Sequence, residues 1–228
     1  MVVLTSHGDL LAVTDLKEPR PRRLADPDLR SALPSCWCVL DPTQTAHKTI
    51  EVVLVTSEKM MLIDTRSAKA FERANDFNHL TVSLAGTLLA AFSDASGVLD
   101  IFLLPFQSAH LKPVSTFATD MAMAPQAFAW CGADAICLAW PTKVSLVGPY
   151  GEAIDYEQEG MAYLVSETDG LRLVTGTTTE FLAKVPCTVF CFFFFLLPSP
   201  FLLSVYWLLL RLHVGCSLCC VLMDAHAV

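Results

Sequence analysis

The sequence predicts an all-β fold, and two observations lead to that expectation. Residues 1–186 consist of short apolar runs separated by Gly, Asp, Ser and Pro, and no stretch keeps a helical spacing of apolar residues for 12 positions. Similar strand-rich segments also recur, beginning near Trp37, Val82 and Ala129, at intervals of 45 and 47 residues. A period of about 40–50 residues with about four short strands per repeat is typical of β-propeller blades. We therefore expect an incomplete β-propeller of about three to four blades.

The first third of the chain contains a hairpin, a loop and three strands by these criteria. The apolar runs that flank Ser6–Asp9 predict the hairpin, and the polar stretch from Lys17 to Pro34, with its four prolines, predicts a long loop. The β-branched run Val52–Val55 favours a sheet over a helix. The expected strands are Val2–Leu4, Leu10–Thr14, Cys36–Leu40, Glu51–Thr56 and Met60–Asp64.

Further along, the clearest pattern is strand, Gly turn, strand, Asp/Gly turn and strand over Leu80–Phe102. The same outline recurs over Ala127–Trp140 and Lys143–Val147, followed by a turn at Gly148–Gly151. A last hairpin is expected from Ala162–Val165 and Leu171–Val174 around Thr168-Asp169-Gly170, and it begins a further blade.

Charge and cysteine content limit the functional classes. The net charge of −8 argues against a nucleic-acid partner, which needs clustered Lys and Arg, and the one basic cluster, Arg20–Arg23, is expected in a solvated loop. Residues 1–13 do not resemble a signal peptide, so we expect a cytosolic body. Its cysteines are then expected to be reduced and buried; they are Cys36, Cys38, Cys131 and Cys137.

Composition changes sharply after Pro186. Residues 187–228 contain one basic and one acidic residue but five of the nine cysteines, and residues 187–210 carry no charge. We therefore divide the chain into a partial propeller, residues 1–186, and a hydrophobic tail rich in Cys, Phe and Leu, residues 187–228.

Three explanations of this tail remain open. An uncharged run of 24 residues is long enough for a membrane-spanning helix, which would make the chain a tail-anchored single-pass membrane protein with a β-rich cytosolic domain. However, Pro198 and Pro200 lie near its centre, and each disfavours a helix by about 3 kcal/mol. The favoured hypothesis is a non-native ending from a retained intron or an alternative exon, and a buried soluble helix is the third explanation.

No group of residues predicts a catalytic, cofactor or metal site. The isolated histidines His7, His47, His79 and His110 are expected in exposed loops, and Cys36 and Cys38 share one face of a strand without a second pair of ligands. The cluster Asp155, Glu157 and Glu159 is interpreted as a solvated acidic loop.

In the tail, the pattern H-x2-C-x2-C-C has zinc-like spacing, but its apolar flanks argue against a zinc ribbon; it comprises His213, Cys216, Cys219 and Cys220. We therefore expect no metal there. The turn Gly148–Gly151 lacks the Lys and the following helix of a phosphate-binding loop.

Several segments resemble the N-terminal propeller of the vacuolar protein sorting-associated protein 16 family. The most similar stretch is Val144–Pro186, including the turn Val147–Gly151 and the run Tyr163–Leu173, in which Ser166 stands where the family usually has proline. Leu33–Trp37 and Ala129–Gly132 are also similar, and the resemblance covers residues 1–186.

This resemblance implies a non-enzymatic scaffold. Members of the family belong to the HOPS and CORVET complexes, which tether endosomes, vacuoles or lysosomes before SNARE-driven fusion. The implied partners are class C vacuolar protein sorting subunits and a Sec1/Munc18-type protein. The Sec1/Munc18-type protein binds a C-terminal solenoid. We expect both this solenoid and the earlier blades of the propeller to be missing here. The implied location is cytoplasmic and peripheral on endosome and vacuole or lysosome membranes. Because a partial propeller exposes unpaired strand edges, we also expect marginal stability.

Overall fold

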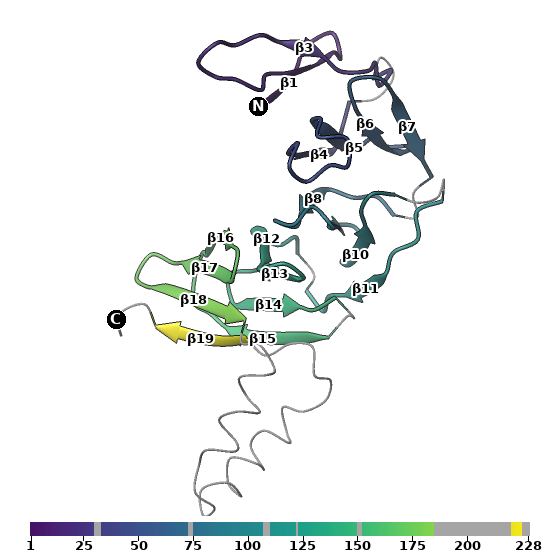
Figure 1. Cartoon of the computed structure of the whole chain (residues 1–228). Coiled ribbons are helices and arrows are strands. Elements are labelled where there is room, and N and C mark those ends of the chain that lie inside the picture. Colours follow the sequence, from purple (N-terminus) through teal and green to yellow (C-terminus); the bar gives the residue numbers. More distant parts are fainter. Residues whose placement is uncertain are drawn as a thin grey trace, which may run out of the picture. The chain divides into compact units, whose positions relative to one another are not determined.

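A computed structural model describes residues 1–29, 33–72, 75–106, 110–121, 123–149, 152–184 and 220–224. In these residues every named element is a strand, and the strands form small antiparallel sheets (Figure 1). Within each sheet, every strand lies beside the one that precedes it in the chain. The all-β prediction is therefore confirmed, and each sheet is a meander of the kind that forms a propeller blade.

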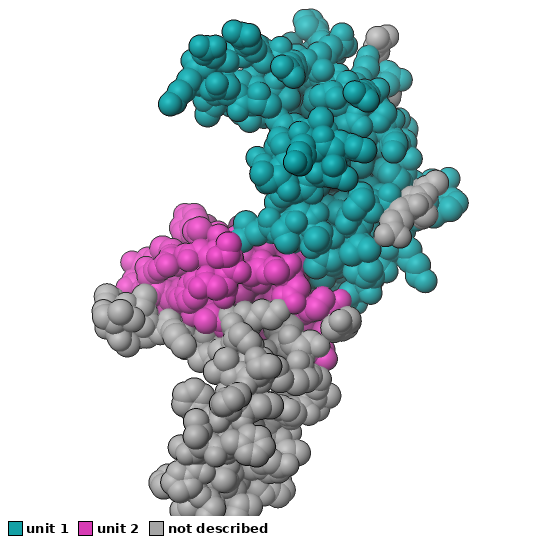
Figure 2. Space-filling view, viewed as in Figure 1, with its two compact units in different colours: residues 1–124 teal, residues 125–228 magenta. Residues whose placement is uncertain are grey.

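The chain divides into two compact units, residues 1–124 and residues 125–228 (Figure 2). The first unit contains one three-stranded sheet and two four-stranded sheets. Their strands are β1 (Val2–Leu4), β2 (Leu10–Ala12) and β3 (Arg22–Arg23); β4 (Cys36–Leu40), β5 (Glu51–Val55), β6 (Met60–Ile63) and β7 (Ala68–Phe71); and β8 (His79–Val82), β9 (Leu88–Ser93), β10 (Val98–Leu103) and β11 (Ser115–Ala118).

The second unit contains two four-stranded sheets. Their strands are β12 (Ala127–Cys131), β13 (Ala135–Ala139), β14 (Lys143–Val147) and β15 (Ala153–Glu157); and β16 (Tyr163–Glu167), β17 (Gly170–Val174), β18 (Thr179–Lys184) and β19 (Cys220–Asp224). The expected period is confirmed, because Trp37, Val82 and Ala129 lie in β4, β8 and β12, the first strand of three successive sheets.

Stacking of one sheet on the next explains why four of the five residues of β5, Val52–Val55, are apolar. All five residues of β5 are buried. Val52 and Leu54 belong to the core cluster shared with the first sheet, whereas Val53 and Val55 belong to the cluster shared with the third. Since successive side chains of a strand point to opposite faces, a strand between two sheets must be apolar on both.

The core of the second unit is formed by the two facing sheets. Leu171, Leu173 and Leu182 from β17 and β18 pack in one cluster with Cys131 and Cys137 from β12 and β13. The expected burial of these two cysteines is confirmed, since both have 0% exposure.

A polar pair joins the third and fourth strands of two sheets. Asp100 of β10 is 3% exposed and accepts a hydrogen bond of 2.7 Å from the hydroxyl of Thr116 in β11. At the matching cross-strand position, Ser145 of β14 donates to Asp155 of β15 over 2.6 Å. Each pair satisfies a polar group inside an otherwise apolar sheet.

The structure corrects some sequence-based expectations. Arg22 and Arg23 form the short exposed strand β3 within the expected loop, where Arg23 lies 2.5 Å from a carboxylate oxygen of Asp9. Asp155 and Glu157 lie in strand β15, so the prediction of an acidic loop is wrong for them. The repeat predicts a fourth strand in each sheet, but the sequence did not locate β7, β11 or β15.

Most of the tail, residues 187–219 and 225–228, lies outside the described residues, and so does the expected tail helix. Its described part, β19, pairs antiparallel with β18, with Leu222 opposite Leu182. Among the described segments there is no helix long and apolar enough to span a membrane.

Candidate functional site

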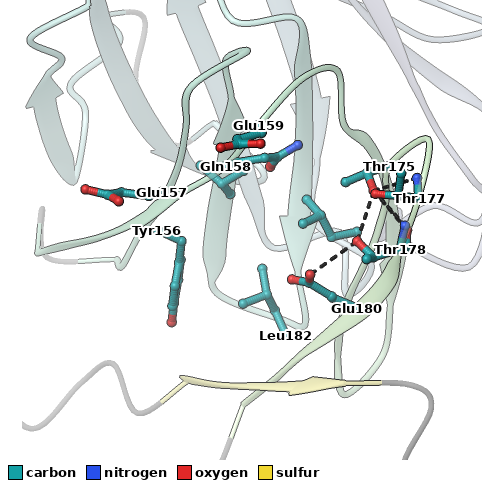
Figure 3. Close-up of a pocket in the computed structure, with 11 residues that line it drawn as sticks. Tyr156, Glu157, Gln158, Glu159, Thr175, Thr177, Thr178, Glu180 and Leu182 are labelled. Atoms are coloured by element: carbon teal, nitrogen blue, oxygen red, sulfur yellow. Dashed lines mark hydrogen bonds between the residues drawn. The ribbon is translucent and has the colours of Figure 1, made fainter.

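The candidate site is a pocket of about 210 Å³ between the two sheets of the second unit (Figure 3). One wall comes from β15 and the residues that follow it, Tyr156 to Glu159, and the other from the turn between β17 and β18 and from Glu180. Val144, Leu173 and Leu182 supply apolar lining. The pocket therefore combines an apolar surface with a polar rim.

Backbone hydrogen bonds hold the wall that contains Gln158. Its backbone N–H donates to the carbonyl of Thr142 over 3.0 Å, and the N–H of Gly160 donates to the carbonyl of Pro141 over 2.9 Å. The Gln158 side-chain Nε2 donates to the carbonyl of Gly160 over 3.4 Å, which fixes the orientation of the amide. The Oε1 atom of the same amide is buried and has no hydrogen-bond donor among the described residues.

The opposite wall is a threonine-rich turn. The hydroxyl oxygen of Thr175 accepts hydrogen bonds from the backbone N–H groups of Thr177 and Thr178, over 3.2 and 2.9 Å. This is the local pattern by which a hydroxyl closes a turn. The hydroxyl of Thr178 then donates to Oε1 of Glu180 over 3.3 Å, so the turn also positions a carboxylate at the pocket (Figure 3).

The pocket is acidic. Glu157, Glu159 and Glu180 contribute to its lining, and none of the described lining residues is basic. The basic residue next to the pocket is Lys143, which lies opposite Glu157 in the pairing of β14 with β15. Its Nζ atom lies 3.2 Å from a carboxylate oxygen of Asp155 and 5.9 Å from the centre of the Trp140 ring. The lining thus offers mainly hydrogen-bond acceptors, which suits the binding of a cation or a neutral donor.

The four isolated histidines of the sequence analysis lie apart from one another in the structure. His7 and His47 are exposed. His79 begins strand β8 and lies 2.9 Å from a carboxylate oxygen of Asp94, so its expected loop position is wrong. His110 is exposed and lies 3.4 Å from a carboxylate oxygen of Glu72. Within the described ranges, no group of three or more His, Cys, Asp or Glu residues could hold a metal ion.

The two cysteines of β4 are confirmed on one face, packed against the core cluster that β4–β6 share with β8–β10, but both are only partly buried, so their expected burial is not borne out in full. Burial, together with the neighbouring Cys36, raises the pKa of the Cys38 thiol to about 12. Because the thiolate is the reactive and metal-binding form, this thiol is inert at neutral pH. The tail residues His213, Cys216 and Cys219 lie outside the described residues, and Cys220 begins β19.

Sequence reasoning missed the pocket, although it selected two of its residues. The sequence predicts that Glu157 and Glu159 lie in an acidic loop, and it yields no prediction for the turn Thr175–Thr178. Only the stacking of the two sheets brings these segments together. The run of four threonines in five residues from Thr175 to Thr179, followed by Glu180, was the available signal.

The Vps16 N-terminal region family model matches residues 1–193, most of the chain. Among curated proteins, the chain is 27% identical to Protein VACUOLELESS1 of Arabidopsis thaliana over 208 residues, covering 82% of this chain and 24% of that protein. It is 28% identical to a vacuolar protein sorting-associated protein 16 homolog of Dictyostelium discoideum over 196 residues, covering 81% and 23%. The chain therefore spans about a quarter of the length of these relatives.

A similar solved structure supports the fold independently. The β-propeller domain of Cps50 (Swd1) from Myceliophteria thermophila superposes with a TM-score of 0.53 at 14% identity, covering 74% of this chain and 61% of that one. A likeness at this identity concerns the fold alone, and it agrees with the stacked four-stranded sheets. The match over residues 1–193 decides the family: the chain belongs to the Vps16 N-terminal region family.

Proposed function

We propose that this chain is a non-enzymatic scaffold of a HOPS/CORVET-type tethering complex that acts in endosome-to-vacuole or endosome-to-lysosome transport and SNARE-mediated membrane fusion. The observation that carries the proposal is the family match over residues 1–193. It is supported by relatives whose names refer to the vacuole and to vacuolar protein sorting.

The geometry is compatible with a binding role. The stacked sheets present loops and strand edges of the kind that propellers use to contact other proteins, and the pocket of the second unit offers acceptors beside apolar surface. The proposed partners are class C vacuolar protein sorting subunits, with a Sec1/Munc18-type protein in the same assembly. The proposed location is the cytoplasm, peripherally on endosome and vacuole or lysosome membranes.

Affinity purification tests this proposal. The full chain, tagged at its N-terminus, is expressed in cells and recovered, and class C subunits are quantified by mass spectrometry. We expect their enrichment over a tag-only control, and a decrease for the Leu182→Asp variant, which places a charge at a fully buried position. If the wild-type chain is recovered soluble without any class C subunit, the proposed assembly is wrong.

A further inference from the structure

We propose that the chain associates with itself head to tail, so that its last sheet stacks on the first sheet of a second copy. Two faces would meet in this contact. The N-terminal face is the side of β1–β3 that bears Val3 and Leu11, and the C-terminal face is the side of β16–β18 that bears Tyr163 and Val165. This association is independent of the tethering function.

The C-terminal face is open to solvent, unlike both faces of β13 in the same unit, where all five residues are buried. In β17, Leu171 and Leu173 are buried in the core of the unit, whereas Arg172 between them is partly exposed on the opposite face. On β16, the side chains of this face are more open still, since Tyr163 is 64% and Val165 50% exposed. The sheet is therefore covered on one side only.

The N-terminal face is open in the same way. Leu10 and Ala12 of β2 are buried in the core cluster shared with β5 and β6, whereas Leu11 between them is partly exposed. Its neighbour on β1, Val3, is 41% exposed. The first and the last sheet thus each bury one apolar face and leave apolar side chains exposed on the other.

The occupant follows from how the sheets stack within the chain. β5 contacts the preceding sheet through Val52 and Leu54, and the following sheet through Val53 and Val55, so it meets its two neighbours with opposite sides. The C-terminal face is the side left for a following sheet, because the other side packs on β12–β14. The N-terminal face is the side left for a preceding sheet. A second copy supplies both neighbours in the stacking order that the chain already uses.

Charges on the two faces do not oppose this contact. On the C-terminal face, Nε of Arg172 donates to a carboxylate oxygen of Glu167 over 2.7 Å. On the N-terminal face, Arg23 forms ion pairs with Asp9 and Asp26. Both cations are therefore paired within their own copy, and association needs no new ion pair. We expect apolar burial to drive it, so added salt should not weaken it.

Both faces are small, so we expect a weak association. Strands lie about 4.8 Å apart and rise about 3.4 Å per residue, so three strands as short as β1–β3 span only about 15 by 10 Å. Interfaces that bury less than about 1,200 Å² in total belong to transient complexes, and we expect a dissociation constant on the order of 100 µM. Because the contact joins two different faces, it can repeat and form species larger than a dimer.

Sedimentation velocity of the full chain, over concentrations that span about 100 µM, tests the association. Val3→Lys and Val165→Lys each place a charge on one face at an exposed position, and each should raise the dissociation constant at least about tenfold. Val114→Lys makes the same change at an exposed valine outside both faces, so it is the matched control and should leave the constant unchanged.

A mixture of the two face variants provides the decisive measurement. Val3→Lys copies keep the C-terminal face and Val165→Lys copies keep the N-terminal face, so together they should form a 1:1 heterodimer and no larger species. A wild-type chain that stays monomeric, or association that persists in both variants, overturns the proposal. Association that is lost only in Val165→Lys and is not restored by mixing also overturns it, since two C-terminal faces would then meet.

Discussion

Replacing Gly170 by alanine tests the packing of the last hairpin. Gly170 begins β17 directly after the two-residue turn Thr168-Asp169, where it pairs with Glu167. Its backbone φ lies outside the left-handed region, so the requirement for glycine here is steric. A Cβ at this position would collide with the Leu182 carbonyl oxygen and would lie 2.9 Å from the ring of Phe181.

The cost follows from what the methyl group meets. Overpacking a folded core costs about 1–3 kcal/mol. Here the colliding Leu182 oxygen belongs to the backbone of β18 and cannot rotate away, so we expect about 2–3 kcal/mol. With a urea dependence of about 1–3 kcal/mol per M, the unfolding midpoint of the Gly170→Ala variant should fall by about 1 M.

Two other glycines of the same unit serve as controls. Gly176 has open space at its Cβ position and is not in the left-handed region, so Gly176→Ala should be neutral or stabilise by about 0.4–1 kcal/mol. Gly160 also has open space but a φ of +89°, so Gly160→Ala should cost about 1–2 kcal/mol through backbone strain alone. The series separates steric from conformational causes.

Urea titration followed by tryptophan fluorescence measures the series. Trp130 and Trp140 are buried reporters of the second unit, and a Trp37→Phe, Trp207→Phe background removes the other tryptophan signals. The expected order of stability is Gly176→Ala, then Gly160→Ala, then Gly170→Ala. A Gly170→Ala variant as stable as Gly176→Ala would refute the close approach of β17 and β18 and therefore the register derived from it.

Three further changes test other parts of the structure. Leu182→Ala should cost about 2–5 kcal/mol in the same titration, because Leu182 is fully buried in the core of the second unit; a cost below about 1 kcal/mol would contradict that burial. Asp100→Ala should cost about 1–3 kcal/mol, since it leaves the Thr116 hydroxyl without its carboxylate; a thermal melt unchanged from wild type would exclude a stabilising role. Burial and the neighbouring Asp64 raise the pKa of Glu51, so the charged form destabilises the fold as pH rises through that pKa. Glu51→Gln should therefore raise Tm at pH 7 and leave it unchanged at pH 3, and an equal effect at both values would argue against this cause.

The sequence was most informative for strands that lie between two sheets. β13 is apolar at every position and β5 at every position but Glu51, and their short runs bounded by turns were recognised as strands. The fourth strands were missed because they are partly exposed and weakly apolar: β7 reads Ala-Lys-Ala-Phe, β11 Ser-Thr-Phe-Ala and β15 Ala-Ile-Asp-Tyr-Glu. The hydrophobic pattern on which such predictions depend is strong only where burial is complete.

The pocket could not be predicted for a different reason. The Gln158 wall and the Thr178 turn are 20 residues apart in sequence, and neither carries a motif with a fixed spacing. The contact between them depends on how β14 and β15 stack on β17 and β18, a non-local property that the pattern of single strands does not contain. Local reasoning therefore did not connect Glu157 and Glu159 with this turn, although their expected exposure to solvent is confirmed.

The weak sequence signal of the fourth strands also bears on the tail. In the sheets ending with β7, β11 and β15 the fourth strand follows the third after 4, 11 and 5 residues, whereas β19 lies beyond the composition change at Pro186 and beyond the family match that ends at residue 193. Pairing with β18 is made by backbone groups, which every residue except proline supplies. A fourth strand therefore requires an extended segment within reach more than it requires a particular sequence, and the tail supplies such a segment, β19, beside β18.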